Sequence, residues 1–248
     1  MRDFADSTLW GVSTFDRVRQ QTGNSGFMRL GGRTLLPTTL LTDLRRVQDN
    51  PATDDVLEVV AACLRHRESA LLCLQHEEYV WPVTLFPLQM LVHSPRDLVT
   101  RGTVNGLATL KVLTAEPPGV RPPGHWMHER VANTEHYRHL VPLLWTLALN
   151  GPRANVLAEI GGRAAYRLVS TRAGERPTPP GALGPAVQRL WRESVSLREM
   201  ATWPGMSLER ASRLLNALYL TGSLLVSRTH PAARDEPARP RVVITIHH

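Results

Sequence analysis

The most regular pattern of apolar and polar positions lies near the C-terminus. Between Ser207 and Gly222, apolar residues recur at i, i+3, i+4 and i+7, at positions 208, 211, 214, 215, 218 and 219. This spacing places them on one stripe of an α-helix. Ser207 is a favoured N-cap, and Gly222 suits the left-handed conformation that ends helices. The pattern therefore predicts a helix from Ser207 to about Leu220.

The segments around this helix predict a small α/β module. Two shorter helical patterns precede the helix, at 185–193 and 197–203, with a turn at 204–206. Two β-branched or apolar runs follow the helix, at 223–228 and 241–246, with a polar loop at 230–240 between them. Such runs flanked by turn residues are typical of strands.

The N-terminal part predicts a mixed α/β domain. Helical spacing at 54–67 begins with negative charge, which the helix dipole favours. A second helical pattern at 126–150 is interrupted by Pro142, which fits the first turn of a new helix. Strands are predicted at 70–74, 80–86, 107–114 and 164–169, with a hairpin at 27–36. Pro82 cannot donate to a ladder, so its strand is expected at an edge or a bulge.

Composition divides these elements into two domains. The segment 171–185 is rich in Pro and Gly, as linkers are. We therefore expect an α+β protein with a mixed α/β sensor or interaction domain at 1–170, a linker at 171–185, and a second domain at 186–248. The chain carries a net charge of +7. Residues 1–150 hold 15 basic and 15 acidic side chains, whereas 151–248 hold 14 and 7, so the excess lies in the C-terminal part.

The order helix, helix, turn, helix, hairpin over residues 183–246 resembles the winged-helix domains of bacterial regulators. The resemblance is carried by SLREMATWPGMSLERASRLLNALYLTGSLLVSR, in which the element order and the position of Gly222 are both fixed. It implies that Ser207–Leu220 is the recognition helix and that Thr229–Pro240 is the wing. It also implies that exposed side chains of the recognition helix contact base edges while the wing contacts phosphates.

A DNA-binding transcriptional regulator is therefore the first functional hypothesis. Arg210, Arg213 and Asn216 lie opposite the apolar stripe and are residue types that contact bases or phosphates. Arg228, Arg239 and Arg241 are the predicted phosphate contacts on the wing. Glu209, Asp235 and Glu236 oppose DNA binding by their charge.

A protein-protein adaptor in a signalling or motility assembly is the alternative, for example with a small GTPase or its regulator. Here the winged helix serves for docking, and the run at 81–86 supplies an exposed apolar edge through Trp81, Val83, Leu85 and Phe86. Packing of the same run inside a core also explains it and is the favoured interpretation. A homodimer is compatible with either hypothesis.

Other chemistry has less support in the sequence. Cys63 and Cys73 are expected to be reduced core thiols. His128, Glu135 and His139 would share one face of a helix and could bind zinc or iron, but polar decoration of a surface helix explains them too, so no metal or cofactor is expected. No phosphate-binding glycine loop or nucleophile motif is found, so we expect no enzyme. No run is long enough to span a membrane and no secretory signal opens the chain, so we expect a cytoplasmic protein.

Overall fold

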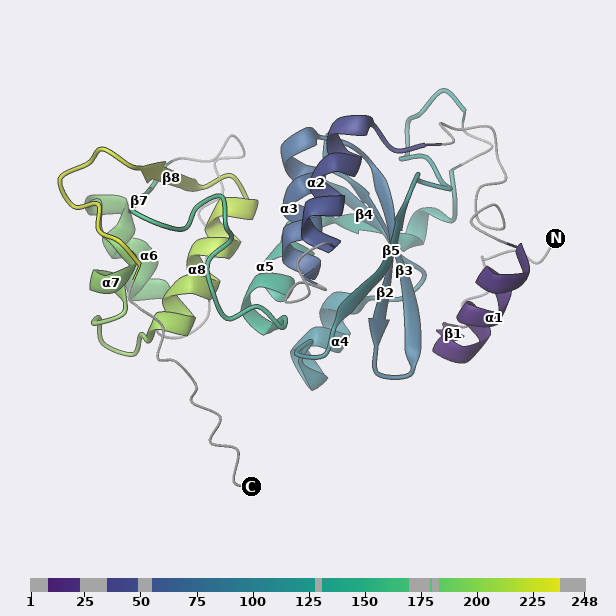
Figure 1. The fold of residues 1–248 in the computed structure, drawn as a ribbon, viewed down its shortest axis with the longest axis horizontal. Helices are drawn as coiled ribbons and strands as arrows, with labels where there is room; N and C mark the ends of the chain where they lie inside the picture. The colour runs from purple at the N-terminus through teal and green to yellow at the C-terminus, as the bar shows by residue number, and fades with distance from the viewer. Residues whose placement is uncertain are drawn as a thin grey trace, which may run out of the picture. The chain divides into compact units, whose positions relative to one another are not determined.

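The computed structural model describes residues 9–22, 35–48, 55–127, 131–169, 179 and 183–236. It has both helices and strands, which confirms the α+β class. The chain forms two compact units, Met1–Arg153 and Ala154–His248. Figure 1 shows the elements of each unit.

The first unit is built on an antiparallel sheet of order β5-β2-β3-β4-β6, in which β1 also pairs with β3. Its strands are β1 (Trp10–Gly11), β2 (Ala70–His76), β3 (Tyr79–Phe86), β4 (Leu91–His93), β5 (Lys111–Glu116) and β6 (Tyr137–His139). The predicted strands at 70–74 and 80–86 are confirmed as β2 and β3. The strand predicted at 107–114 corresponds to β5, which begins four residues later and ends two residues later than predicted. The hairpin predicted at 27–36 lies largely outside the described residues.

Helices cover both faces of this sheet. They are α1 (Val12–Thr22), α2 (Thr38–Gln48), α3 (Val56–His66), α4 (Leu98–Asn105) and α5 (Leu140–Asn150). Phe15 of α1 packs against Cys73 and Val80 on one face, and Figure 1 shows α2 and α3 on the opposite side of the sheet. The helix predicted at 54–67 is confirmed as α3: the Asp55 side chain accepts from the Leu57 N–H at its start, and Arg67 takes φ 55° at its end.

The predicted helix over 126–150 is correct only in its second half. Pro142 does lie in the first turn of α5, but Thr134–His136 form a 3₁₀ turn and Tyr137–His139 form β6. The backbone groups of β6 find their hydrogen-bond partners in β4, whereas in a helix they would bond to residues one turn away. The helical face proposed for His128, Glu135 and His139 is therefore wrong. His128 lies outside the described residues, and those that are described hold no group of three or more potential metal ligands.

The second unit contains three helices and a small sheet. Its elements are β7 (Ala165–Leu168), α6 (Leu183–Arg192), α7 (Leu197–Met200), α8 (Leu208–Leu220) and β8 (Leu224–Ser227). The Ser207 hydroxyl accepts from the Arg210 N–H at the start of α8, and Gly222 takes φ +71°, as the sequence predicts. The apolar stripe of α8 is buried, including Ala211, Leu214, Leu215 and Leu218.

The middle strand of the small sheet is β7, which precedes the three helices of this unit in the chain. β7 pairs with β8 on one side, and on the other side Tyr166 exchanges both backbone hydrogen bonds with Val195. The sequence analysis assigned 165–168 to the N-terminal domain, whereas the structure pairs these residues within the second unit. The division between the units accordingly falls after Arg153, ahead of the predicted linker at 171–185, most of which is outside the described residues.

Candidate functional site

Asn216, a predicted base-contacting residue, is fully buried on α8. Its side-chain oxygen accepts from the Leu157 N–H at 2.9 Å, and its amide nitrogen donates to the Asn155 carbonyl at 2.9 Å. The irregular segment 155–157 therefore covers the part of the helix that the sequence analysis placed in the solvent. The prediction that Asn216 is exposed is wrong, because the helical period of α8 cannot reveal a partner some sixty residues upstream.

The two arginines predicted beside Asn216 bond within the protein. Arg210 is exposed and donates to the Gly205 carbonyl at 2.7 Å. The Arg213 side chain is only 17% exposed and pairs with Glu209 at 2.9 Å. Beyond Arg213, α8 is buried except at Tyr219, which is half-buried. If α8 entered the major groove of DNA, only its first turn and a half could contact the bases.

Arginines assigned to the predicted wing also form hydrogen bonds with other residues of the second unit. The Arg228 guanidinium donates to the carbonyls of Glu159, Gly161 and Arg163. Arg234 forms a backbone bridge with Ala164 and donates from its side chain to the carbonyls of two nearby residues. Arg239 and Arg241, the remaining predicted phosphate contacts, lie outside the described residues.

The apolar run predicted as an exposed docking edge lies inside the first unit. Trp81, Val83, Leu85 and Phe86 are all at most 6% exposed. They belong to β3, which lies between β2 and β4 in the sheet, so the prediction of an exposed edge is wrong. A strand with helices or loops over both faces carries apolar residues almost continuously.

Pro82 is tolerated in this central strand because of its register. The turn between His76 and Tyr79 has two residues, which makes Cys73 and Pro82 a pair that exchanges no backbone hydrogen bonds. The nitrogen of Pro82 therefore faces away from β2. On that side, β3 pairs with β1 up to Val80 and with β4 only from Thr84, so within the described part of the sheet no ladder bond is lost at Pro82.

A pocket of about 320 Å³ lies at the turn between β2 and β3. It is lined by Leu9, His76, Glu77, Tyr79, Trp81, Arg96 and Arg101. Tyr79 and Trp81 alternate along β3, so both side chains leave the same face of the sheet. Arg96 precedes α4, and Arg101 extends from that helix. The pocket thus combines two aromatic side chains with two guanidinium groups, and its volume is within the range of ligand sites.

The polar wall of this pocket is held in place by bonds to its own residues. Arg101 donates to the Glu77 carboxylate at 2.7 Å. Nε2 of the buried His76 lies 3.1 Å from the Gly106 carbonyl oxygen, which fixes the imidazole beneath the turn. Glu77 takes φ 56°, a left-handed conformation that is uncommon for a residue other than Gly.

Charge and exposure indicate what the pocket can bind. Two guanidinium groups and one carboxylate are among the lining residues, so the lining carries a net positive charge, which attracts an anionic group. Tyr79 is 48% exposed, whereas Trp81 is nearly buried, so an apolar group can pack on the tyrosine ring at the mouth. The arrangement suits a ligand that carries a carboxylate or another anion beside an apolar or aromatic group.

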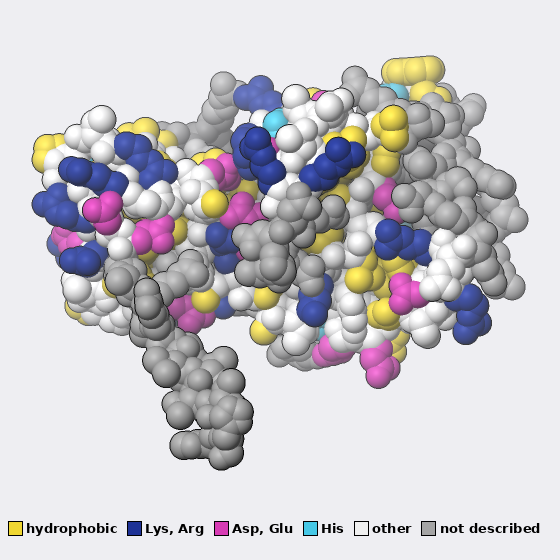
Figure 2. Space-filling model, in the orientation of Figure 1, with side chains coloured by type: hydrophobic (Ala, Val, Ile, Leu, Met, Phe, Trp, Pro, Cys, Tyr) yellow, Lys and Arg dark blue, Asp and Glu magenta, His cyan; other side chains and the backbone are white. Residues whose placement is uncertain are grey.

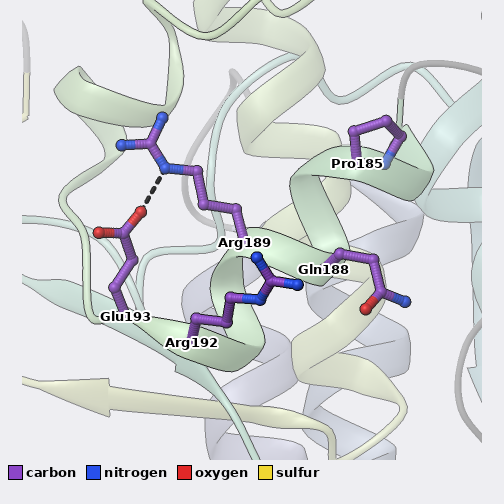
Figure 3. A pocket seen from close by; sticks show the side chains of 5 residues that line it. All are labelled: Pro185, Gln188, Arg189, Arg192 and Glu193. Carbon is purple, nitrogen blue, oxygen red and sulfur yellow. Dashed lines mark hydrogen bonds and ion pairs between the residues drawn. The ribbon is translucent and has the colours of Figure 1, made fainter.

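A second pocket, of about 470 Å³, lies along α6 in the second unit. Its lining consists of Pro185, Gln188, Arg189, Arg192 and Glu193. Figure 3 shows that Arg189 turns toward Glu193, with which it forms an ion pair. Arg189 also lies over the Trp203 ring, 4.5 Å from its centroid. The lining carries no large apolar side chain, so this surface lacks the apolar floor that is typical of a ligand site.

Comparison with known proteins finds no matching family model, no matching curated protein and no matching solved structure. Among the described residues, no helix is long and apolar enough to cross a membrane.

The side chains of four exposed arginines of the second unit make no hydrogen bond or ion pair with any described residue: Arg163, Arg167, Arg192 and Arg198. Figure 2 shows that Arg side chains on the visible face of this unit are interspersed with Asp and Glu. The basic excess predicted from the sequence is thus present, but acidic side chains interrupt it.

His93 and Glu116, two ionisable groups of the first sheet with shifted pKa values, do not form an acid–base pair. Burial, together with the charges of His136 and Arg138, lowers the pKa of His93 to about 4. Burial raises the pKa of Glu116. Both lie in one cross-strand row, but Leu71 and Thr84 separate them. At about 4.8 Å per strand they are about 14 Å apart, too far for direct proton transfer.

The sequence did not predict most of the pocket at the turn between β2 and β3. The sequence analysis assigned no functional role to His76, Glu77, Tyr79, Arg96 or Arg101. The alternation of Tyr79 and Trp81 was a usable signal for a shared face. The approach of Arg101 to Glu77, across 24 residues of chain, has no local signal.

Proposed function

We propose that the protein is a non-enzymatic adaptor that binds a protein partner at the pocket at the turn between β2 and β3. The observation that carries this proposal is the pocket lining of Tyr79, Trp81, Arg96 and Arg101. Trp, Tyr and Arg are the residues most enriched among those that dominate the affinity of protein interfaces.

The partner is an acidic segment with an aromatic or apolar anchor residue. The guanidinium groups of Arg96 and Arg101 favour a carboxylate, and the half-exposed Tyr79 ring favours an apolar side chain next to it. A pocket of about 320 Å³ accommodates one or two side chains rather than a folded element. Recognition of a short, extended acidic peptide fits these dimensions.

The second unit fits the adaptor as a winged-helix-like module. The order of α6, α7, α8 and β8, with Ser207 and Gly222 bounding α8, supports this assignment. The side chains of Asn216 and Arg228 form hydrogen bonds with the backbone of segment 155–163 and are therefore not available to DNA. Of the two roles inferred from the sequence for this module, docking is therefore favoured over insertion of α8 into DNA.

An array of acidic peptides, each with one aromatic residue at varied spacing, tests the proposal. The purified full-length protein should retain a subset of these peptides. Tyr79→Ala and Arg96→Glu should each weaken a retained peptide by roughly 30-fold or more, as expected for residues that dominate an interface.

Leu88→Ala is the matched control, because Leu88 is 67% exposed and is not part of the pocket lining. It should leave peptide affinity unchanged. Equal affinity for the wild type and both pocket variants would contradict the proposal, as would an array on which no acidic peptide is retained.

DNA binding through the second unit is the second candidate, supported by Arg163, Arg167, Arg192 and Arg198. Fluorescence anisotropy with mixed-sequence duplex DNA at low and then higher salt tests it. Binding through phosphates must weaken steeply as salt rises. Arg192→Ala combined with Arg198→Ala should then reduce affinity, whereas no binding at low salt would eliminate this candidate.

A further inference from the structure

The pocket at the turn between β2 and β3 contains a carboxylate of its own. Glu77 lines this pocket together with Arg96 and Arg101. Its Oε2 atom accepts a hydrogen bond from Nη2 of Arg101 at 2.7 Å. An acidic group that enters the pocket therefore meets a guanidinium that already binds a carboxylate.

The geometry of the turn does not explain why residue 77 is Glu. Glu77 is the first of the two residues between His76 and Tyr79, and it takes φ 56°. Two-residue turns favour Gly, Asn or Asp at a position with positive φ, because most other side chains are strained there. The turn would therefore be more stable with Gly at this position.

The ion pair with Arg101 does not explain Glu77 by stability either. The side chains of Glu77 and Arg101 are 47% and 36% exposed. Ion pairs at such exposure contribute little to folding, since water and salt screen the charges and two long side chains lose freedom. Because nearly half of the Glu77 side chain already lies in solvent, its carboxylate can leave Arg101 at a small cost. The contact is weak and reversible.

The bonding geometry of Arg101 makes Glu77 a competitor of any second carboxylate. A guanidinium holds a carboxylate best through two adjacent N–H groups. Nη2 takes part in both such arrangements, either with Nη1 or with Nε. Because Glu77 accepts from Nη2, a second carboxylate held in this way on Arg101 must replace Glu77 or lie against it. Adjacent carboxylates repel each other, so replacement is favoured.

We propose that Glu77 is a built-in competitor for the acidic group of the partner. The Glu77 carboxylate occupies Arg101 in the free protein and is displaced when the partner's acidic group binds. An anion that relies on Arg101 alone gains little, because one carboxylate replaces another. A ligand that also packs an apolar group on Tyr79 keeps the gain from that contact. Glu77 thus selects for an acidic group beside an apolar one. This role rests on the proposed function, since it concerns the same pocket.

Titration of the full-length protein with phenylacetate, followed by NMR, tests the competition. Phenylacetate carries one carboxylate beside one aromatic ring, and phenylacetamide is its neutral counterpart. The amide signal of Tyr79 and the indole N–H signal of Trp81 report binding in the pocket. Glu77→Gln should bind phenylacetate roughly fivefold more tightly than the wild type, because the competing charge is removed. Affinity for phenylacetamide should not change.

Glu78→Gln is the matched control, because it removes the same charge from the neighbouring residue. Glu78 is exposed and is not part of the pocket lining, so this variant should change phenylacetate affinity by less than about twofold. Glu77→Gly is a second test variant. It removes the whole side chain, and Gly adopts φ 56° without strain. It should fold at least as well as the wild type and show at least the gain of Glu77→Gln.

Equal phenylacetate affinity in Glu77→Gln and Glu78→Gln would overturn the proposal. Weaker binding by Glu77→Gln would also overturn it, since Glu77 would then orient Arg101 for the ligand. An equal gain for phenylacetamide, or no phenylacetate binding by any of these proteins, would have the same consequence.

The array of acidic peptides separates this inference from the proposed function. Peptides that the wild type retains but that Glu77→Gln binds no more tightly would refute the competition alone. Tighter phenylacetate binding by Glu77→Gln, with no acidic peptide retained on the array, would refute the protein partner alone.

Discussion

Replacing Asn216 by Ala separates a structural role from a role in DNA binding. The substitution removes two hydrogen bonds, to the Leu157 N–H and the Asn155 carbonyl, in a site with no solvent access. Each lost bond is worth about 1 kcal/mol, and each buried backbone group left without a partner costs about 1 to 3 kcal/mol. We expect the second unit to lose about 3 kcal/mol of unfolding free energy.

Differential scanning calorimetry measures this loss. For a unit of this size, a loss of about 3 kcal/mol lowers the Tm by roughly 10 to 20 °C. The transition of the first unit should not move. Exchange of the Leu157 amide should accelerate in the variant, because its acceptor is removed.

Arg210→Ala is the control on the same helix, since its side chain is exposed and should change the unfolding free energy by less than about 1 kcal/mol. The structural role of Asn216 would be refuted by a variant with unchanged Tm and unchanged exchange at Leu157. If the same variant also lost about 1 to 3 kcal/mol of DNA affinity, Asn216 would be a base contact after all.

Three further predictions concern the first unit. Arg67→Gly should stabilise it by about 1 kcal/mol in urea unfolding, because Arg67 ends α3 at φ 55° and Gly adopts that conformation without strain; a lower midpoint would contradict this. The pKa of His93 is lowered to about 4, so the unfolded state takes up the proton first and stability falls by up to about 3 kcal/mol as pH drops from 6.5 toward 4. His93→Gln should flatten this pH profile, and an unaltered profile would exclude His93 as its source. Burial raises the pKa of Cys63 to about 12 and that of Cys73 to about 11, so a thiol reagent at pH 8 should label neither until the protein unfolds; rapid labelling of the native protein would argue against their burial.

Local sequence signals predicted the elements that are stabilised by local interactions. α3 was predicted with its acidic start because Asp55 caps its own helix two residues ahead. α8 was predicted with both ends because the Ser207 hydroxyl bonds three residues ahead and Gly222 needs no tertiary partner for its conformation. Such signals depend on neighbours within one helical turn.

Elements that depend on distant partners were missed or displaced. The residues around His136 carry helical periodicity, yet β6 forms there because β4, more than forty residues upstream, provides its backbone partners. β7 was assigned to the wrong side of the predicted domain boundary, because its strand partner β8 follows it by about sixty residues. The run from Trp81 to Phe86 could have been recognised as a buried central strand, since its apolar residues do not alternate with polar ones.

Two of the residues predicted to contact DNA, Asn216 and Arg228, instead support an irregular stretch of backbone. Residues 155–163 belong to no helix or strand, so their polar backbone groups need other partners. Asn216 bonds this stretch at Asn155 and Leu157, Tyr166 donates to the Ile160 carbonyl, and Arg228 donates to three further carbonyls. Polar side chains that converge on base edges and polar side chains that converge on a loop backbone are the same residue types, because both targets present donors and acceptors. A helical wheel cannot distinguish the two, whereas the burial of Asn216 can.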